Sequence, residues 1–334
     1  ALLDRLFAPG QPLSKGMKLS SFSGSSRRQC VVLLGPSGSG KTRKALEFLR
    51  DRRGVYLSYR DQNDKNLGSW ALTRVLDVKE KLLPKMSHVD WTEKVVVGGR
   101  DDAAFTTRRL AVHFAVKCAL AAYRLVYEEW LSVLKSRARA RGLKEIPPPK
   151  WLLAQLFPDD FFGVDVFERV AMELFNAFDP RDESVFTAAT MPGGPCVIDE
   201  AQAFGQMLPD MFNIQGNGVS PRPLLSAVIS GVHDALGRLP VILGTGLSLV
   251  TEWKITTSAA ATLDTARFVF HDFPPLTKGD VRKLLTRVLA CDADPRLDEA
   301  CEWLVGRPRW TTHFIERALG EGAVKPPALF YGSK

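Results

Sequence analysis

The sequence predicts an α/β protein built on a parallel β-sheet, and two observations carry this prediction. Short apolar or β-forming runs, at Cys30–Leu34 and Gly54–Tyr59, are separated by a segment of helical periodicity. A later run, Pro195–Ile198, is apolar at successive positions, as expected for a central strand that is covered on both faces. Leu239–Gly246 and Ala266–Phe273 are further strand candidates. This alternation of strands and helices favours a parallel sheet.

The helix after the first strand has the sequence KTRKALEFLRDRR. Ala45, Leu46, Phe48 and Leu49 recur on one stripe, which can pack on a sheet. Gly54 follows three arginines and is expected at the C′ position, where a left-handed glycine often ends a helix.

The chain is expected to divide into three segments. Residues 1–29 are rich in Gly, Ser, Lys and Pro and form a lead-in. Residues 30–275 form the sheet domain, with a helical insertion at about 101–180 that begins with an unusually long helical pattern. After Pro274 and Pro275 the pattern is helical again, so residues 276–334 are expected to form a separate C-terminal lid.

Composition indicates which ligands and which cellular compartment suit the protein. The chain has 334 residues, is 45% hydrophobic and carries a formal net charge of +8, which suits phosphates and also permits nucleic acid. Its five cysteines are odd in number and include no C-x-x-C pair, so a reducing intracellular compartment, cytoplasm or nucleus, is expected. The most apolar stretch, residues 110–126, contains His113, Lys117 and Arg124. We therefore expect no transmembrane helix and no membrane partner.

Eight residues, GPSGSGKT at Gly35–Thr42, stand between the first strand and the first helix, which is the context of a phosphate-binding P-loop. Glycines let backbone amides approach phosphates closely, and the helix start offers unpaired N–H groups. Lys41 is placed to reach the β- and γ-phosphates, and the Thr42 hydroxyl to coordinate Mg²⁺. The motif predicts a nucleoside triphosphate ligand, ATP in preference to GTP; the alternative is a glycine-rich turn that happens to contain a lysine. The residues expected at the nucleotide are Gly35, Pro36, Ser37, Gly38, Ser39, Gly40, Lys41 and Thr42.

Asp199 and Glu200 follow the apolar run directly and are the candidates for metal and water chemistry. A hydrolytic P-loop enzyme needs one carboxylate for the metal shell and a second to orient and deprotonate water. We assign Asp199 to Mg²⁺ and Glu200 to the water. The alternative is that the two acids cap the next helix.

Three further side chains are expected near the phosphates. Thr245 ends a strand candidate in the sequence LGTG and is placed to sense the γ-phosphate or position water; a simple turn is the alternative. Arg309 is the first choice for a catalytic arginine on the lid and Arg307 the second, as a nucleotide-binding residue, against solvated arginines at a helix start. Arg267 is a weaker candidate for a finger that reaches a neighbouring subunit of a homo-oligomer.

A basic run lies at the end of the long helical pattern and is a candidate for contact with nucleic acid, with a solvated helix end as the alternative. Its members are Lys135, Arg137, Arg139, Arg141 and Lys144.

The ordered set of motifs resembles the P-loop NTPase domain of Crinkler-type and retrotransposon hot spot proteins, relatives of the AAA+ and STAND ATPases. The motifs are GPSGSGKTRKALEFL, GVYLSY, WLLAQLF, CVIDEAQAF, VILGTGLSL, FPPLTKGDVRKLL and WLVGRPRWTTHFIE, within about residues 25–320. The resemblance implies Walker A at Gly35–Thr42, Walker B at Asp199 and Glu200, sensor 1 at Thr245 and a lid motif at Gly306–Arg309. It also implies an ASCE-type sheet of order 51432, a helical or winged lid, and secretion into a host cell.

The leading functional hypothesis is an Mg-dependent ATPase in which binding and hydrolysis switch an attached or bound effector. A non-hydrolysing nucleotide-binding interaction module is the main alternative, because the same fold serves both. A DNA-stimulated ATPase and a small-molecule kinase are further alternatives.

Overall fold

The computed structural model describes residues 29–35, 39–50, 52, 54–59, 67–77, 103–142, 150–178, 194–208, 211–212, 222–238, 240–244, 266–270, 275–289, 291, 294–306 and 308–320. At residues 29–30, 103–106, 266–268, 270 and 308–309 the description covers the backbone alone.

A parallel β-sheet forms the centre of the molecule, which confirms the predicted α/β fold class. Its strands are β1 (Gln29–Leu34), β2 (Val55–Ser58), β3 (Cys196–Asp199), β4 (Val241–Gly244) and β5 (Ala266–Phe270). Their order across the sheet is β2-β3-β4-β1-β5, and each neighbouring pair is parallel. The strands are short, and those with described side chains are buried along their length, as expected for a sheet that is covered on both faces.

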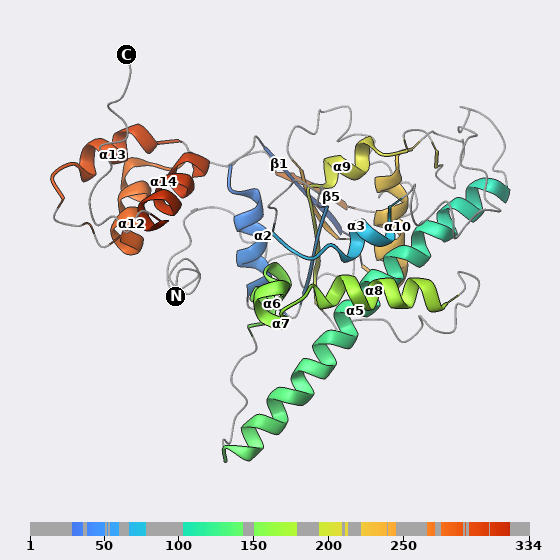
Figure 1. Cartoon of the computed structure of the whole chain (residues 1–334). Helices are drawn as coiled ribbons and strands as arrows, with labels where there is room; N and C mark the ends of the chain where they lie inside the picture. Colours follow the sequence, from blue (N-terminus) through green and yellow to red (C-terminus); the bar gives the residue numbers. More distant parts are fainter. Residues whose placement is uncertain are drawn as a thin grey trace.

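Helices cover both faces of this sheet, and Figure 1 shows α2 and α10 on opposite sides of it. Val31 and Leu33 of β1 pack in one cluster with α2, whereas Val32 and Leu34 pack in a second cluster with α5 and α10. Because successive side chains of a strand point to opposite faces of the sheet, β1 contributes to a hydrophobic core on each face. The helices are α2 (Lys41–Arg50), α3 (Ala71–Val75), α5 (Ala103–Ala140), α6 (Trp151–Leu156), α7 (Pro158–Phe162), α8 (Val166–Ala177), α9 (Ala201–Gln206) and α10 (Leu224–Leu236).

Side chains from the helical segment cover the free edge of β2. The Tyr56 amide donates to the Gln155 side-chain oxygen over 2.8 Å, and the Tyr123 hydroxyl donates to the Tyr56 carbonyl over 3.1 Å. Trp151 and Gln155 both donate to the Gly54 carbonyl. An exposed strand edge is a site of aggregation and holds unsatisfied backbone groups, so these contacts take the place of a missing neighbour strand.

The long helix α5 has 38 residues and runs from the core to a projecting end (Figure 1). Within the described residues, the stretch Thr107–Ala140 is long and apolar enough to cross a membrane by length and composition, contrary to our expectation that no stretch would qualify. Most of that apolar window, 78%, is buried inside the protein, because α5 packs against α8 and α10. The apolar character of α5 is thus accounted for by its place in the core.

Gly54 does not end α2, which corrects the expected C′ role. The helix ends at Arg50, and Gly54 has no positive φ. A Cβ atom at Gly54 would lie 2.4 Å from Leu49 Cδ2 and 2.5 Å from the Pro195 carbonyl oxygen. The glycine is therefore required by close packing between α2, β2 and the chain that enters β3.

The C-terminal helices form a unit with its own core, beside the sheet domain in Figure 1. They are α12 (Lys278–Leu289), α13 (Leu297–Leu304) and α14 (Pro308–Gly320), and their apolar faces meet around Val281, Leu285 and Ile315. The Gly306 amide donates to the Leu276 carbonyl over 2.9 Å, which ties the start of the unit to the turn before α14. The described part of this unit is helical rather than winged.

Candidate functional site

The candidate site lies at the carboxyl edge of the sheet, where β1 leads into the glycine-rich loop and β3 ends in acidic residues. Leu34 pairs with Gly244, and Ser58 pairs with Asp199, so the ends of four strands are aligned at this edge. Ligands of open parallel sheets bind outside the carboxyl ends of the strands. The sequence-predicted residues Gly35, Ser39, Gly40, Lys41, Thr42, Asp199 and Glu200 are all described here.

Thr42 and Asp199 are brought together although they stand 157 positions apart in the chain. The Thr42 hydroxyl, in the first turn of α2, donates to Asp199 Oδ2 over 2.8 Å. Asp199 is buried at the end of β3, with 4% of its surface exposed. The arrangement places a hydroxyl oxygen and a carboxylate oxygen side by side, and both are hard donors of the kind that Mg²⁺ prefers.

Lys41 begins α2, and its ammonium group lies over the loop that precedes it. Its Nζ donates to the Gly35 carbonyl over 2.7 Å and to the Ser39 hydroxyl over 3.3 Å. Burial lowers the pKa of Lys41 from its ordinary value, against the opposing effect of the Asp199 and Glu200 carboxylates. Only 6% of the surface of Lys41 is exposed, and a buried charge is costly without partners, so the loop oxygens stabilise it.

Gly40 supports this loop through its backbone conformation. Its φ is 96°, in the region that side-chain-bearing residues rarely adopt, and an added Cβ atom would meet no other atom within 4 Å. The requirement for glycine here is therefore conformational rather than steric.

Tyr56 is a site residue that sequence reasoning missed. Its hydroxyl donates to Asp199 Oδ2 over 2.7 Å, so this oxygen accepts from both Tyr56 and Thr42. Burial, with the Asp199 carboxylate beside it, raises the pKa of Tyr56 well above its ordinary value, and the hydroxyl stays protonated as a donor. The Glu200 amide donates to the other oxygen, Asp199 Oδ1, over 2.8 Å. The carboxylate is thus fixed by three donors.

Glu200 occupies a strained backbone position. Its φ of 53° and ψ of 35° are left-handed, which is uncommon for a residue with a long side chain. It stands at the N-cap of α9 but its side chain makes no cap hydrogen bond; instead the Gln202 side chain donates to the Glu200 carboxylate. This speaks against the alternative in which Glu200 serves as a side-chain cap. The turn directs the chain sharply away from β3 after Asp199.

The donor set of the site suits a metal that is bound partly by another molecule. Among the residues that the structure describes, no group of three or more His, Cys, Asp or Glu side chains could hold a metal ion. Mg²⁺ is commonly bound by one or two protein oxygens together with phosphate oxygens and water, rather than by a complete protein cage. Thr42 and Asp199 fit such a partial site.

Several predicted residues lie outside the described part of the chain, in whole or in their side chains. Residues Pro36, Ser37, Gly38, Thr245 and Arg307 are outside it, and only the backbone is described for Arg267, in β5, and Arg309, in α14. Their proposed contacts stay predictions.

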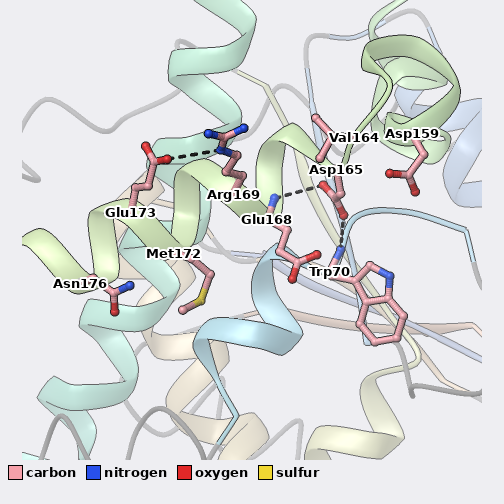
Figure 2. Close-up of a pocket in the computed structure, with 9 residues that line it drawn as sticks. All are labelled: Trp70, Asp159, Val164, Asp165, Glu168, Arg169, Met172, Glu173 and Asn176. Carbon is pink, nitrogen blue, oxygen red and sulfur yellow. Dashed lines mark hydrogen bonds and ion pairs between the residues drawn. The ribbon is translucent and has the colours of Figure 1, made fainter.

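A separate hollow of about 560 Å³ lies beside α3 and α8, and Figure 2 shows its lining side chains. Asp165 is structural there: it accepts from the Ser69 hydroxyl over 2.7 Å and from the Trp70 amide over 2.8 Å. The remaining charged residues are mostly acidic, which is the wrong sign for a polyphosphate. The lining residues are Trp70, Asp159, Val164, Asp165, Glu168, Arg169, Met172, Glu173 and Asn176.

No protein-family model matches the chain, and no curated protein is significantly similar to it.

Proposed function

We propose that this chain is a P-loop NTPase that binds Mg-ATP at the carboxyl edge of its sheet and hydrolyses it. The contact between Thr42 and Asp199 is the observation that carries the proposal. Mg²⁺ prefers hard oxygen donors and is commonly bound by one or two protein oxygens together with phosphate oxygens, so a phosphate-bound Mg²⁺ is the ligand that this pair fits.

The topology supports the same assignment. Read from the β5 edge, the strand order is 5-1-4-3-2, the order that the resemblance to Crinkler-type and other ASCE NTPases implies. In this order β4 stands between β1 and β3, so the loop after β1 and the acid after β3 flank one crevice. We assign the chain to this group on the motif order and on this topology.

Each residue has a defined task in the proposal. The Gly35–Thr42 loop and the first turn of α2 would cradle the phosphates with backbone amides. Lys41 would exchange its bonds to Gly35 and Ser39 for phosphate oxygens, because those neutral acceptors compete weakly with an anion. Thr42 and Asp199 would hold Mg²⁺, which when bound offsets negative charge on the phosphates.

Glu200 would act on the attacking water. It directly follows the metal-side carboxylate, and the left-handed turn and Gln202 hold its carboxylate in a fixed setting. A carboxylate that accepts the proton of a bound water is a general base. Hydrolysis would then reset the nucleotide state, and the proposed output is a change in the attached or bound effector.

Calorimetry with Mg-ATP and Mg-GTP on the full chain tests the binding step. We expect Lys41→Ala to abolish the binding heat, whereas Lys44→Ala, one turn along the same helix and paired with Glu47, leaves it unchanged. Equal heats from the wild type and Lys41→Ala would refute the proposal. Phosphate release tests the second step: turnover lost in Glu200→Gln with binding retained supports hydrolysis, and binding without any turnover in the wild type favours the non-hydrolysing module.

A further inference from the structure

The C-terminal end of α5 projects from the molecule and carries the densest unopposed positive charge in the described structure. Figure 1 shows this end extending beyond α6, α7 and α8. Between Trp130 and Gly142 the sequence has four basic residues and no acidic one. Among the described residues, none of the four makes an ion pair, and each is exposed. We call residues 132–141 the basic tip; its cations are Lys135, Arg137, Arg139 and Arg141.

The cations of the basic tip form two rows. Lys135 and Arg139 are four residues apart and lie in one row, and Arg137 and Arg141 lie in another. At 3.6 residues per turn, the two rows stand about 160° apart around the helix axis. Positive charge therefore flanks the helix on opposite sides instead of covering one face.

The two arcs between these rows differ in chemistry. On one arc Ala138 is buried and Leu134 is half-buried. The other arc is exposed and carries small or uncharged side chains, namely Ser132, Val133, Ser136 and Ala140. Glu129 lies on the same exposed arc about 10 Å further back along the axis, at 1.5 Å per residue from Ser136, and marks the inner limit of the tip.

We propose that the basic tip inserts into the major groove of duplex DNA. The groove is about 12 Å wide and a helix with its side chains is about 10–12 Å across, so a helix seated in it meets a phosphate wall on each side. Two opposed rows of cations match two opposed walls. Three of the four cations are arginines, whose planar guanidinium binds phosphate through two hydrogen bonds.

The small exposed arc fits the floor of the groove. Short side chains at Ser132, Ser136 and Ala140 let the helix approach the base edges, and Val133 can contact a thymine methyl group. An anionic membrane would require apolar residues on the outward arc with the cations beside them, and the outward arc here is mostly small and polar. The deep, narrow major groove of duplex RNA excludes a helix of this width.

Fluorescence anisotropy with short labelled DNA duplexes tests the site on the full chain. Four phosphate contacts correspond to a slope of about −3.6 in log affinity against log salt, or roughly a 150-fold loss between 50 and 200 mM salt. The tip variant K135Q/R137Q/R139Q/R141Q should bind at least about tenfold more weakly and lose most of that slope. The matched control R169Q/K283Q/R287Q/R317Q removes the same charge from exposed positions elsewhere and should bind like the wild type.

A second pair of variants tests the groove geometry. Ser136→Glu places a negative charge on the exposed arc and should weaken DNA binding about tenfold or more, whereas Ala177→Glu adds the same charge at an exposed position of α8 and should not. Far-ultraviolet circular dichroism confirms that each variant is folded. Equal losses in the tip and control variants, unchanged binding by the tip variant or by Ser136→Glu, or tighter binding to duplex RNA or phosphatidylserine vesicles than to DNA would each overturn the inference. The inference does not depend on the proposed nucleotide site, so the tip variant should give the same heat of Mg-ATP binding as the wild type.

Discussion

The Tyr56 hydroxyl donates a 2.7 Å hydrogen bond to Asp199 Oδ2 and thereby joins the edge strand β2 to the acid at the end of β3. The two strands are direct neighbours in the sheet, with Tyr56 opposite Val197. A buried carboxylate needs donors, and this tyrosine supplies one from within the fold itself. The acid is consequently oriented before any ligand arrives.

Tyr56→Phe should loosen that orientation. We expect the free energy of unfolding to fall by about 1–2 kcal/mol, because a buried hydrogen bond to a carboxylate is lost. If Asp199 holds Mg²⁺ as proposed, the Mg²⁺ concentration needed for nucleotide binding should rise about tenfold, since supporting hydrogen bonds tune metal ligands. Denaturant unfolding and a magnesium titration measure the two effects.

Tyr127→Phe is the matched control for this change. Tyr127 is also buried, and its hydroxyl makes no hydrogen bond in the described structure. Removing that hydroxyl should leave stability equal or slightly higher. Equal losses in the two variants would show that the Tyr56–Asp199 bond makes no specific contribution.

Two substitutions at Glu200 distinguish the cost of its backbone conformation from the role of its carboxylate. Glu200→Gly should stabilise the protein by about 1 kcal/mol relative to Glu200→Ala, because glycine tolerates the φ of 53°. Both variants lose the carboxylate, so both should lose ATP turnover if Glu200 activates water. Thermal unfolding and phosphate release measure these outcomes, and full turnover in either variant would contradict the assigned role.

The His113–Asp234 pair should stabilise the folded protein at neutral pH, and this contribution should be lost at acidic pH. His113 Nδ1 lies 2.9 Å from Asp234 Oδ2 and links α5 to α10. Burial opposes ionisation of Asp234, but the hydrogen bond and charge of His113 outweigh it and lower the pKa of this carboxyl below 3.8. A lowered carboxyl pKa contributes stability above its unfolded value, and this is lost as pH falls through the folded value.

Asp234→Asn should therefore reduce the free energy of unfolding at pH 7 by at most about 1 kcal/mol, a figure that allows for solvent screening at a half-exposed group. The difference from the wild type should shrink as pH falls below about 4. Urea unfolding at several pH values measures it. Glu173→Gln removes the exposed partner of Arg169 and should leave the profile unchanged; a constant difference at all pH values would contradict the expectation for Asp234.

Gly54→Ala should destabilise the sheet domain by about 3 kcal/mol, since the new methyl group would overlap a backbone oxygen that cannot move cheaply. Gly279→Ala is the comparison: it lies near the start of α12, and its nearest atom would be 3.8 Å away. Alanine there should be neutral or stabilising, because it is the better helix former. A tolerant Gly54→Ala variant would contradict the packing argument.

Local pattern was sufficient to predict the strands and the first helix. Val31 to Leu34 are apolar on both faces, and the helix from Lys41 shows its stripe, so each element carries its own signal. Asp199 could be placed at a strand end for the same reason. Its meeting with Thr42 follows from parallel strands whose carboxyl ends share one edge.

The remaining features depend on tertiary contacts that no local pattern contains. Tyr56 resembles any strand aromatic until the register sets it beside Asp199. Gln155 is a polar residue in a short apolar helix, and its role at the edge of β2 depends on where that helix packs. The predicted C′ role of Gly54 was wrong because glycine after a helix usually adopts a left-handed conformation. Here glycine is needed because Leu49 and the Pro195 carbonyl leave no room for a side chain.

The Tyr123 hydroxyl anchors the middle of α5 to the carbonyl of Tyr56, the residue whose own hydroxyl holds Asp199. A helix transmits axial displacement along its length because its backbone bonds are stiff. A displacement of the outer end of α5 along its axis would act on this hydrogen bond and on β2, as well as on the packing of α5 against α8 and α10. Through Tyr123 and Tyr56, the outer end of α5 is thus mechanically connected to the acidic end of β3.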